Sequence, residues 1–352
     1  MKLTGVFVIE TGVVNRGDGI GNIATVKKIT TPEGIKVFFS PVSYKRALWN
    51  ALQKYKGWSK PIVTKEGGVV QRTGTIIDSE EFDFAGTMVA KPKYEREAPF
   101  VVDNGISINN YFGDMEFMTN MAISKLYGED EANIINKENF YGIYIMPFGI
   151  EIDRVGVQKS DIIAELTDKE YKKIKDKIDN RKNKKLDSNR DKIETLYEIM
   201  EDYFSLNIDL DFDKFSNIVE DIEIEEIIKK ENKKWKAYIS IYIILKKEER
   251  KRRLKELLEG MGELSKRLEG SERNLTPFFA SFSLDYIAPK YMLLIKDYLK
   301  KKINEGGYLD TKELSNKVKE FAQKEGKRIK IADYLTYNQV VNEIIEEIFQ
   351  ES

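Results

Sequence analysis

The chain has 352 residues, of which 41% are hydrophobic and 33% charged, and it contains neither cysteine nor histidine. Their absence excludes disulfides, zinc fingers, thiolate nucleophiles and Ser-His-Asp triads, so any chemistry would depend on carboxylates, lysine, tyrosine or a bound metal. Residues 1–72 contain twelve Lys and Arg against four acidic residues, a net charge of +8, whereas residues 201–231 contain eleven acidic residues and three lysines, a net charge of −8. This asymmetry is typical of a polyanion binder with acidic surfaces elsewhere.

The N-terminal residues predict no targeting segment. They lack the charged, apolar and small-residue regions of a signal peptide, and the longest apolar run, residues 237–245, is far shorter than the roughly 20 residues that a membrane span needs. We therefore expect a soluble cytoplasmic protein with no membrane partner.

The first elements predicted along the chain are strands and one well-marked helix. Residues 3–9 alternate apolar side chains on both faces, and residues 23–29 and 35–39 follow as short strands joined by a turn at 30–34. Residues 40–57 have a serine N-cap, proline at the first helical position, apolar residues at helical spacing and a terminal glycine. This segment is the best-marked helix of the chain.

The rest of the chain predicts further strands and helices. Strands are expected at 140–152 and 277–284, and helices at 168–181, 191–203, 222–264, 291–301 and 338–349. The order strand, helix, strands, helix, strand predicts an α+β fold with a ferredoxin-like, RRM-type core, into which residues 160–250 are inserted as a helical segment.

Two segments of the N-terminal part suggest an anion site. Hydroxyls and backbone N–H groups at a helix N-terminus attract phosphate, and two cations in the next turn oppose the helix dipole unless they serve a polyanion. The residues are Asn15 and Arg16 after the first strand, and Ser40, Ser43, Lys45 and Arg46 at the helix start.

These segments resemble a known family. The opening strand, the N-R-G-D of residues 15–18 and the S-P-V-S-Y-K-R-A-L of residues 40–48 look like the backbone subunit of type I CRISPR surveillance complexes (Cascade), most like the type I-B, DevR/Cst-like branch of the RAMP superfamily. Residues 84–88, then 98–108 leading to 113–120, and then 253–264 followed by 278–284 agree in order. The resemblance covers residues 1–155 and 250–290.

The resemblance implies three parts. Residues 1–159 would form the first part of an RRM-like palm, with a β-hairpin thumb near 108–140, and residues 251–352 would complete the palm and add C-terminal helices. It also implies Asn22, Met88 and Arg96 as RNA contacts beside the anion site, and Tyr111, Phe112 and Phe117 as thumb residues that pack on a neighbouring subunit or a base. The helical insertion, 160–250, receives no function.

The function implied is that of a non-catalytic scaffold without metal or cofactor. It would oligomerise head-to-tail along the crRNA, present the bases for pairing with target DNA, and work with other Cascade subunits and a recruited helicase-nuclease in antiviral defence.

Two alternatives remain open on the sequence. One is a metal-dependent endoribonuclease like the backbone subunits of type III complexes, with Asp18 as its catalytic residue and Asp114 behind it. The other is an acidic interaction protein without a nucleic-acid role, which predicts no salt-dependent binding of RNA.

Overall fold

The computed structural model describes residues 1–66, 68–128, 134–206, 210–285 and 290–350, and these form two compact units. The first unit comprises Met1–Leu52, Val101–Ile150 and Leu257–Glu347, and the second comprises Gln53–Phe100, Glu151–Glu256 and Ile348–Ser352. Among the residues so described, no helix is long and apolar enough to cross a membrane.

The elements have the following bounds. The strands are β1 (Lys2–Gly12), β2 (Ile23–Ala24), β3 (Lys28–Thr31), β4 (Gly34–Phe39), β5 (Val63–Glu66), β6 (Val69–Arg72), β7 (Thr87–Val89), β8 (Lys93–Arg96), β9 (Phe100–Val102), β10 (Gly105–Asn110), β11 (Met115–Thr119), β12 (Ile134–Glu138), β13 (Tyr141–Glu151), β14 (Val157–Leu166), β15 (Val219–Glu231), β16 (Lys234–Leu245), β17 (Ser265–Leu268), β18 (Ser271–Asn274), β19 (Phe279–Ser283) and β20 (Lys330–Ala332). The helices are α1 (Pro41–Tyr55), α2 (Glu80–Ala85), α3 (Met121–Tyr127), α4 (Asp168–Asn183), α5 (Asn189–Phe204), α6 (Phe212–Ser216), α7 (Lys247–Gly262), α8 (Lys290–Asn304), α9 (Thr311–Lys324) and α10 (Tyr337–Gln350), with a 3-10 turn at Ile152–Arg154.

The first unit is built on a sheet whose strand order is β20-β19-β1-β13-β10-β4-β3. Within it, β1, β10, β13 and β19 are the successive strands of a strand-helix-strand-strand-helix-strand pattern whose helices are α1 and α7. Across the sheet they lie in the order β19-β1-β13-β10, that is, fourth, first, third and second along the chain, which is the order of a ferredoxin-like sheet. The α+β, ferredoxin-like palm predicted from the sequence is confirmed.

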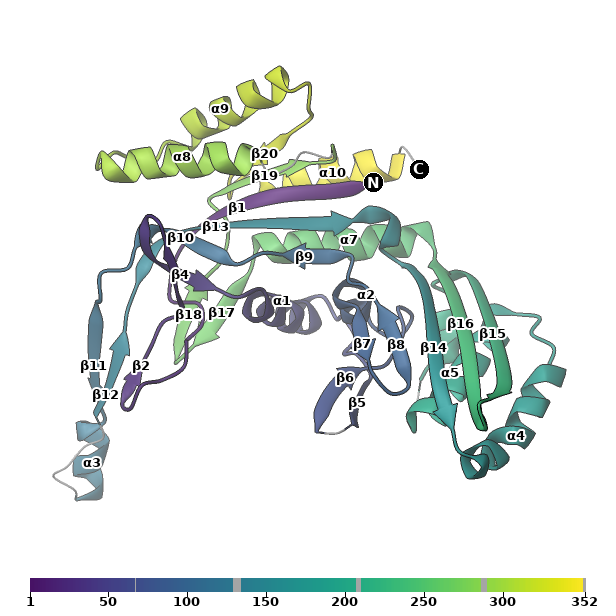
Figure 1. Ribbon diagram of the computed structural model, residues 1–352. Coiled ribbons are helices and arrows are strands. Elements are labelled where there is room, and N and C mark those ends of the chain that lie inside the picture. Colours follow the sequence, from purple (N-terminus) through teal and green to yellow (C-terminus); the bar gives the residue numbers. More distant parts are fainter. Residues whose placement is uncertain (67, 129–133, 207–209, 286–289, 351–352) are drawn as a thin grey trace. The chain divides into compact units, whose positions relative to one another are not determined.

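Strand β1 is buried on both faces, as its alternation predicted. Val6 and Val8 pack into a cluster with the apolar faces of α8 and α9, which Figure 1 shows above this strand. Phe7 faces the other way, in edge-on contact with Phe148, Phe282 and Tyr337. A strand covered on both sides has a near-continuous apolar sequence, as this strand has.

Helix α1 begins and ends where the N-cap Ser40 and the terminal Gly57 predicted. The C-terminal end of α7 lies against this helix. A Cβ on Gly260 would come within 2.7 Å of Leu52 Cδ2 and 3.3 Å of Leu48 Cδ1, so glycine permits this close approach. The packing fixes the direction in which the N-terminus of α1 points.

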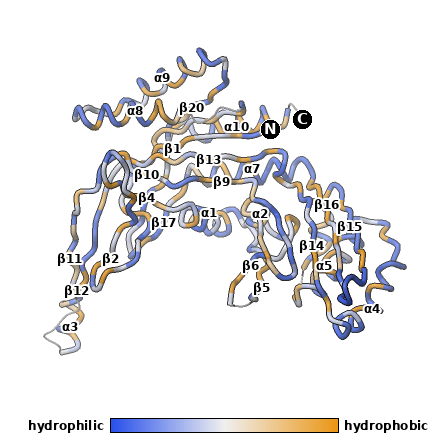
Figure 2. Tube along the Cα trace, in the orientation of Figure 1, coloured by the Kyte–Doolittle hydropathy of each residue, from blue (hydrophilic) through white to orange (hydrophobic). Residues whose placement is uncertain are grey.

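The second unit contains an antiparallel sheet in the order β15-β16-β14-β8-β7. Helices α4 and α5 pack on it, and hydropathy alternates along β15 and β16, as Figure 2 shows. Residues 160–250 belong to this unit together with 53–100 and are not a purely helical insertion. The predicted helices at 168–181 and 191–203 are confirmed as α4 and α5.

The prediction of a helix over 222–264 is wrong for the first half of that range. Residues 219–245 form the hairpin β15–β16, whose turn places Asn232 and Lys233 at φ +48° and +67°, and only α7 follows as a helix. Isoleucines at alternate positions, 222 and 224 and then 239, 241 and 243, favour strands, because β-branched side chains suit a pleated, half-buried sheet. The strand predicted at 23–29 is divided into β2 and β3.

Candidate nucleic-acid interface

The N-terminus of α1 is tied to the end of β1 by polar contacts. Ser40 Oγ accepts a hydrogen bond from the Ser43 N–H at 3.3 Å, which caps the helix, and Asn15 Oδ1 accepts one from the Ser40 N–H at 3.2 Å. The first turn of α1 contains no acidic residue. Two separate segments thus build one electropositive helix start.

Lys266, on β17, adds a cation at the same point. Its ammonium group donates to the carbonyl of Val14 at 2.7 Å and to Ser43 Oγ. Burial lowers the pKa of Lys266. Lys266 was not predicted from the sequence, because nothing in the chain near position 266 links it to a helix that begins at Pro41.

Arg16 lies beside this point at the centre of a mixed charge cluster. Its Nε and Nη2 donate to the two carboxylate oxygens of Glu269 at 3.1 and 2.9 Å, and its Nη1 donates to the carbonyl of Glu138. Lys137, on β12, reaches the same Glu269 carboxylate at 3.0 Å. Lys28 in turn pairs with the Glu138 side chain at 2.6 Å.

We call this group the Arg16 cluster. It comprises Arg16, Lys28, Lys137 and Lys266 with the carboxylates of Glu138 and Glu269. Four cations against two carboxylates leave a local excess of positive charge next to the start of α1. Phosphate groups are the natural ligands of guanidinium and ammonium groups arranged in this way.

The other predicted contacts of the first unit lie at its surface. Asn22 is exposed in the loop before β2, and its carbonyl accepts a hydrogen bond from the Asn136 N–H of β12 at 3.1 Å. On α1, Arg46 is exposed and Lys45 half-buried, one turn after Pro41. The structure therefore gathers Asn15, Arg16, Ser40 and Ser43 closely, with Asn22, Lys45 and Arg46 on the neighbouring loop and helix.

Met88 and Arg96 lie in the second unit, and the burial of Arg96 argues against the RNA contact predicted for it. Arg96 is 5% exposed, and its guanidinium donates to Asp83 Oδ1 at 2.8 Å and to the carbonyls of Asp83, Arg154 and Val157. Asp83 is also buried and receives a second guanidinium, from Arg253, at 3.2 Å. Arg96 is thus part of the core. Met88 is 80% exposed on β7, and its contact with RNA stays a prediction.

An antiparallel hairpin lies where the thumb was predicted. Strands β11 and β12 pair from Met115–Glu138 to Thr119–Ile134, and Figure 1 shows them projecting from the sheet with α3 at their end. Phe112 and Phe117 are 85% and 63% exposed, so they are not core aromatics. Tyr111 is half-buried, with the Lys28 ammonium 4.7 Å from its ring centre.

Further apolar side chains are exposed along this hairpin and its helix: Met115, Met118, Met121, Ile123, Leu126, Tyr127, Ile134 and Ile135. A concentration of exposed apolar side chains of this kind is typical of a surface that a partner covers.

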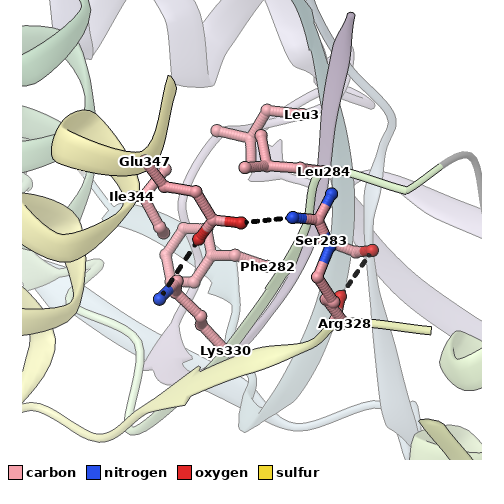
Figure 3. A pocket seen from close by; sticks show the side chains of 8 residues that line it. All are labelled: Leu3, Phe282, Ser283, Leu284, Arg328, Lys330, Ile344 and Glu347. Atoms are coloured by element: carbon pink, nitrogen blue, oxygen red, sulfur yellow. Dashed lines mark hydrogen bonds and ion pairs between the residues drawn. The ribbon is translucent and has the colours of Figure 1, made fainter. Parts of the chain in front are cut away.

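A small pocket in the first unit has different chemistry. Leu3, Phe282 and Ile344 contribute apolar atoms, and Glu347 lies between Arg328 and Lys330, as Figure 3 shows. The carboxylate pairs with both cations, at 2.9 and 3.3 Å. With room for about one water molecule, this pocket is too small for a phosphate group.

The carboxylates proposed for the endoribonuclease alternative form no evident metal centre. Asp18 is exposed in the loop between β1 and β2, and its backbone carbonyl accepts a hydrogen bond from Thr25. Across the described part of the chain, no group of three or more acidic side chains could hold a metal ion. No observation of the structure favours that alternative.

Comparison with known proteins agrees with this geometry. Residues 3–302 match the model of the family described as CRISPR-associated negative auto-regulator DevR/Csa2. The chain belongs to this family. The family resemblance inferred from the sequence is confirmed. No curated protein matches the sequence.

Two solved structures similar to this chain carry the titles "CRISPR RNA-guided surveillance complex, pre-nicking" and "CRISPR RNA-guided surveillance complex". Their TM-scores are 0.51 and 0.50, each with 8% sequence identity, and each match covers 99% of this chain and 100% of the other. At this identity the likeness shows a shared fold, and the shared fold extends over the whole chain.

Proposed function

We propose that this DevR/Csa2-family chain is a guide-RNA-binding scaffold subunit of a CRISPR surveillance complex. The observation that carries the proposal is the meeting of the Arg16 segment and Lys266 with the N-terminus of α1, contributed by segments far apart in the sequence. Membership of the family and the fold shared with RNA-guided surveillance complexes support it.

The residue types favour binding of the RNA backbone. Guanidinium, ammonium, hydroxyl and helix N–H groups recognise phosphate and ribose, and these contacts carry no sequence information. The bases then stay available for pairing with target DNA, which supplies the sequence specificity. The protein acts as a scaffold and not as a catalyst, and DNA unwinding and cutting belong to a recruited helicase-nuclease.

The thumb hairpin supports assembly into a larger complex. Phe112, Phe117 and the other exposed apolar residues of β11, β12 and α3 form a surface that would be costly to leave in water. A chain that repeats along one RNA needs a surface that contacts the next copy. Further copies of this chain, and other Cascade subunits at the ends of the array, are the proposed partners.

The proposal is tested by measuring RNA binding by a variant of the Arg16 cluster and by a matched control variant. Lys266→Ala removes the cation beside Val14 and Ser43, whereas Lys319→Ala removes an exposed cation from α9. We expect Lys266→Ala to weaken binding of a guide-length RNA about fivefold and to reduce the salt dependence, and Lys319→Ala to change it less than about twofold. Equal effects of the two variants would contradict the proposed interface.

A further inference from the structure

The turn between β17 and β18 has an unusual residue. Leu268 pairs with Ser271, so Glu269 and Gly270 form a two-residue turn, and both have positive φ values of +52° and +79°. Turns of this type favour Asn, Asp or Gly at the first position, because other side chains are strained in the left-handed region. A glutamate at this position suggests that its side chain has a function that outweighs the backbone cost.

The Glu269 side chain reaches cations from two other segments. Both of its oxygens accept hydrogen bonds from Arg16, at 3.1 and 2.9 Å, and one also contacts the Lys137 ammonium at 3.0 Å. The hydrogen bond from Arg16 is the main cause that lowers the pKa of Glu269 to about 2. The carboxylate is therefore ionised at neutral pH.

The carboxylate occupies donors that suit a phosphate. A guanidinium fork with an ammonium group beside it binds two oxygens of a carboxylate or of a phosphate in the same way. The Glu269 side chain is 30% exposed, against 15% for Arg16 and 11% for Lys137. A ligand that approaches from solvent therefore meets the carboxylate before it meets the cations.

We propose that Glu269 is a phosphate-mimicking latch, which holds Arg16 and Lys137 in the free protein and is displaced by a backbone phosphate when RNA binds. This inference rests on the proposed RNA-binding function, and it adds Lys137 to the residues that contact the phosphate. The latch lies in a surface turn, so its release needs only a rearrangement of that turn or of the glutamate side chain.

Removal of the latch charge should strengthen RNA binding. Glu269→Gln keeps the length of the side chain but gives up its charge, so a phosphate no longer competes with a carboxylate. We expect the dissociation constant for RNA to fall about fivefold at low salt, and the gain to shrink as salt is added, because the competition is electrostatic.

The experiment measures binding of a labelled, guide-length oligouridine by the full chain, freed of co-purified nucleic acid, at several salt concentrations. Glu272→Gln is the matched control, because it makes the same charge change on the same hairpin, where Glu272 accepts a hydrogen bond from Ser265 and not from Arg16. Glu269→Asn is a second latch variant that suits the left-handed backbone. In the Arg16→Ala background, where only Lys137 still pairs with Glu269, Glu269→Gln should give a smaller gain.

The outcomes separate the latch from the proposed function. Tighter binding by Glu269→Gln and Glu269→Asn, with Glu272→Gln within about twofold of wild type, supports the latch. Unchanged or weaker binding by both Glu269 variants, with a wild-type chain that binds RNA, overturns the latch and leaves the proposed function standing. If neither the wild type nor any variant binds RNA, the proposed function fails and the latch fails with it.

Discussion

Replacement of Arg96 by methionine should destabilise the protein without affecting its contacts with RNA. Arg96 donates to Asp83 Oδ1 at 2.8 Å and to three backbone carbonyls, and both side chains are buried. Methionine keeps the apolar stem but leaves these acceptors without that donor. The variant therefore distinguishes a core ion pair from an RNA contact.

The expected cost follows from the buried network. Breaking a buried ion pair by removal of one partner costs about 3–5 kcal/mol. Asp83 keeps Arg253 at 3.2 Å and the Gly156 N–H at 3.0 Å, so the lower end of that range, about 3 kcal/mol, applies. In a unit of this size, this loss corresponds to a fall in melting temperature of roughly 6–12 °C.

Arg154→Met is the matched control. Arg154 pairs with Glu97 at 2.7 Å at the surface of the same unit, where an ion pair contributes less than about 1 kcal/mol. Thermal and urea unfolding of both variants, followed by circular dichroism, gives the stabilities, and RNA binding is measured below the transition. If Arg96→Met lost RNA affinity tenfold while its unfolding midpoint stayed at the wild-type value, the assignment of Arg96 to the core would be refuted.

Three further predictions follow from the surface and from the core. Lys45→Ala with Arg46→Ala should weaken RNA binding about tenfold at low salt and lower the salt slope, measured by fluorescence anisotropy, and an unchanged slope would contradict a phosphate contact there. Phe112→Ser with Phe117→Ser should reduce RNA-dependent assembly, measured by sedimentation, without a change in unfolding midpoint, and normal assembly would show that these exposed rings are dispensable. Burial raises the pKa of Asp78 to about 6, so the folded state binds the proton more tightly than the unfolded state does. The free energy of unfolding of the wild type should therefore fall relative to that of Asp78→Asn as pH rises from about 4 to 6. Parallel pH profiles of the unfolding free energies of the two proteins would rule this out.

Local patterns in the sequence were enough to predict the elements that frame the interface. Strand β1 and helix α1 carry their own signals, namely alternation on two faces, a serine cap and a terminal glycine. Such signals depend only on neighbouring residues. Asn15, Arg16, Ser40 and Ser43 were found in this way, and the structure brings them together.

The remainder of the site depends on long-range pairing. Lys137 and Lys266 come from strands that are more than one hundred residues from Arg16 in the sequence, and Glu269, in the turn of the hairpin that carries Lys266, meets Arg16 and Lys137. The burial of Arg96 was missed for the same reason. A charged residue is interpreted as exposed unless its partner is known. For Arg96, the neighbours Asp83 and Arg253 come close only in the folded chain.

The most direct test of the central claim is equilibrium binding of the purified wild-type chain to guide-length RNA, with length-matched duplex DNA in parallel, over a series of RNA lengths and salt concentrations. A scaffold that grips the backbone of a guide predicts cooperative binding to RNA that strengthens with RNA length and weakens steeply with salt, because each phosphate contact releases counterions. Binding that is absent, or that does not change with RNA length and salt, would contradict the account.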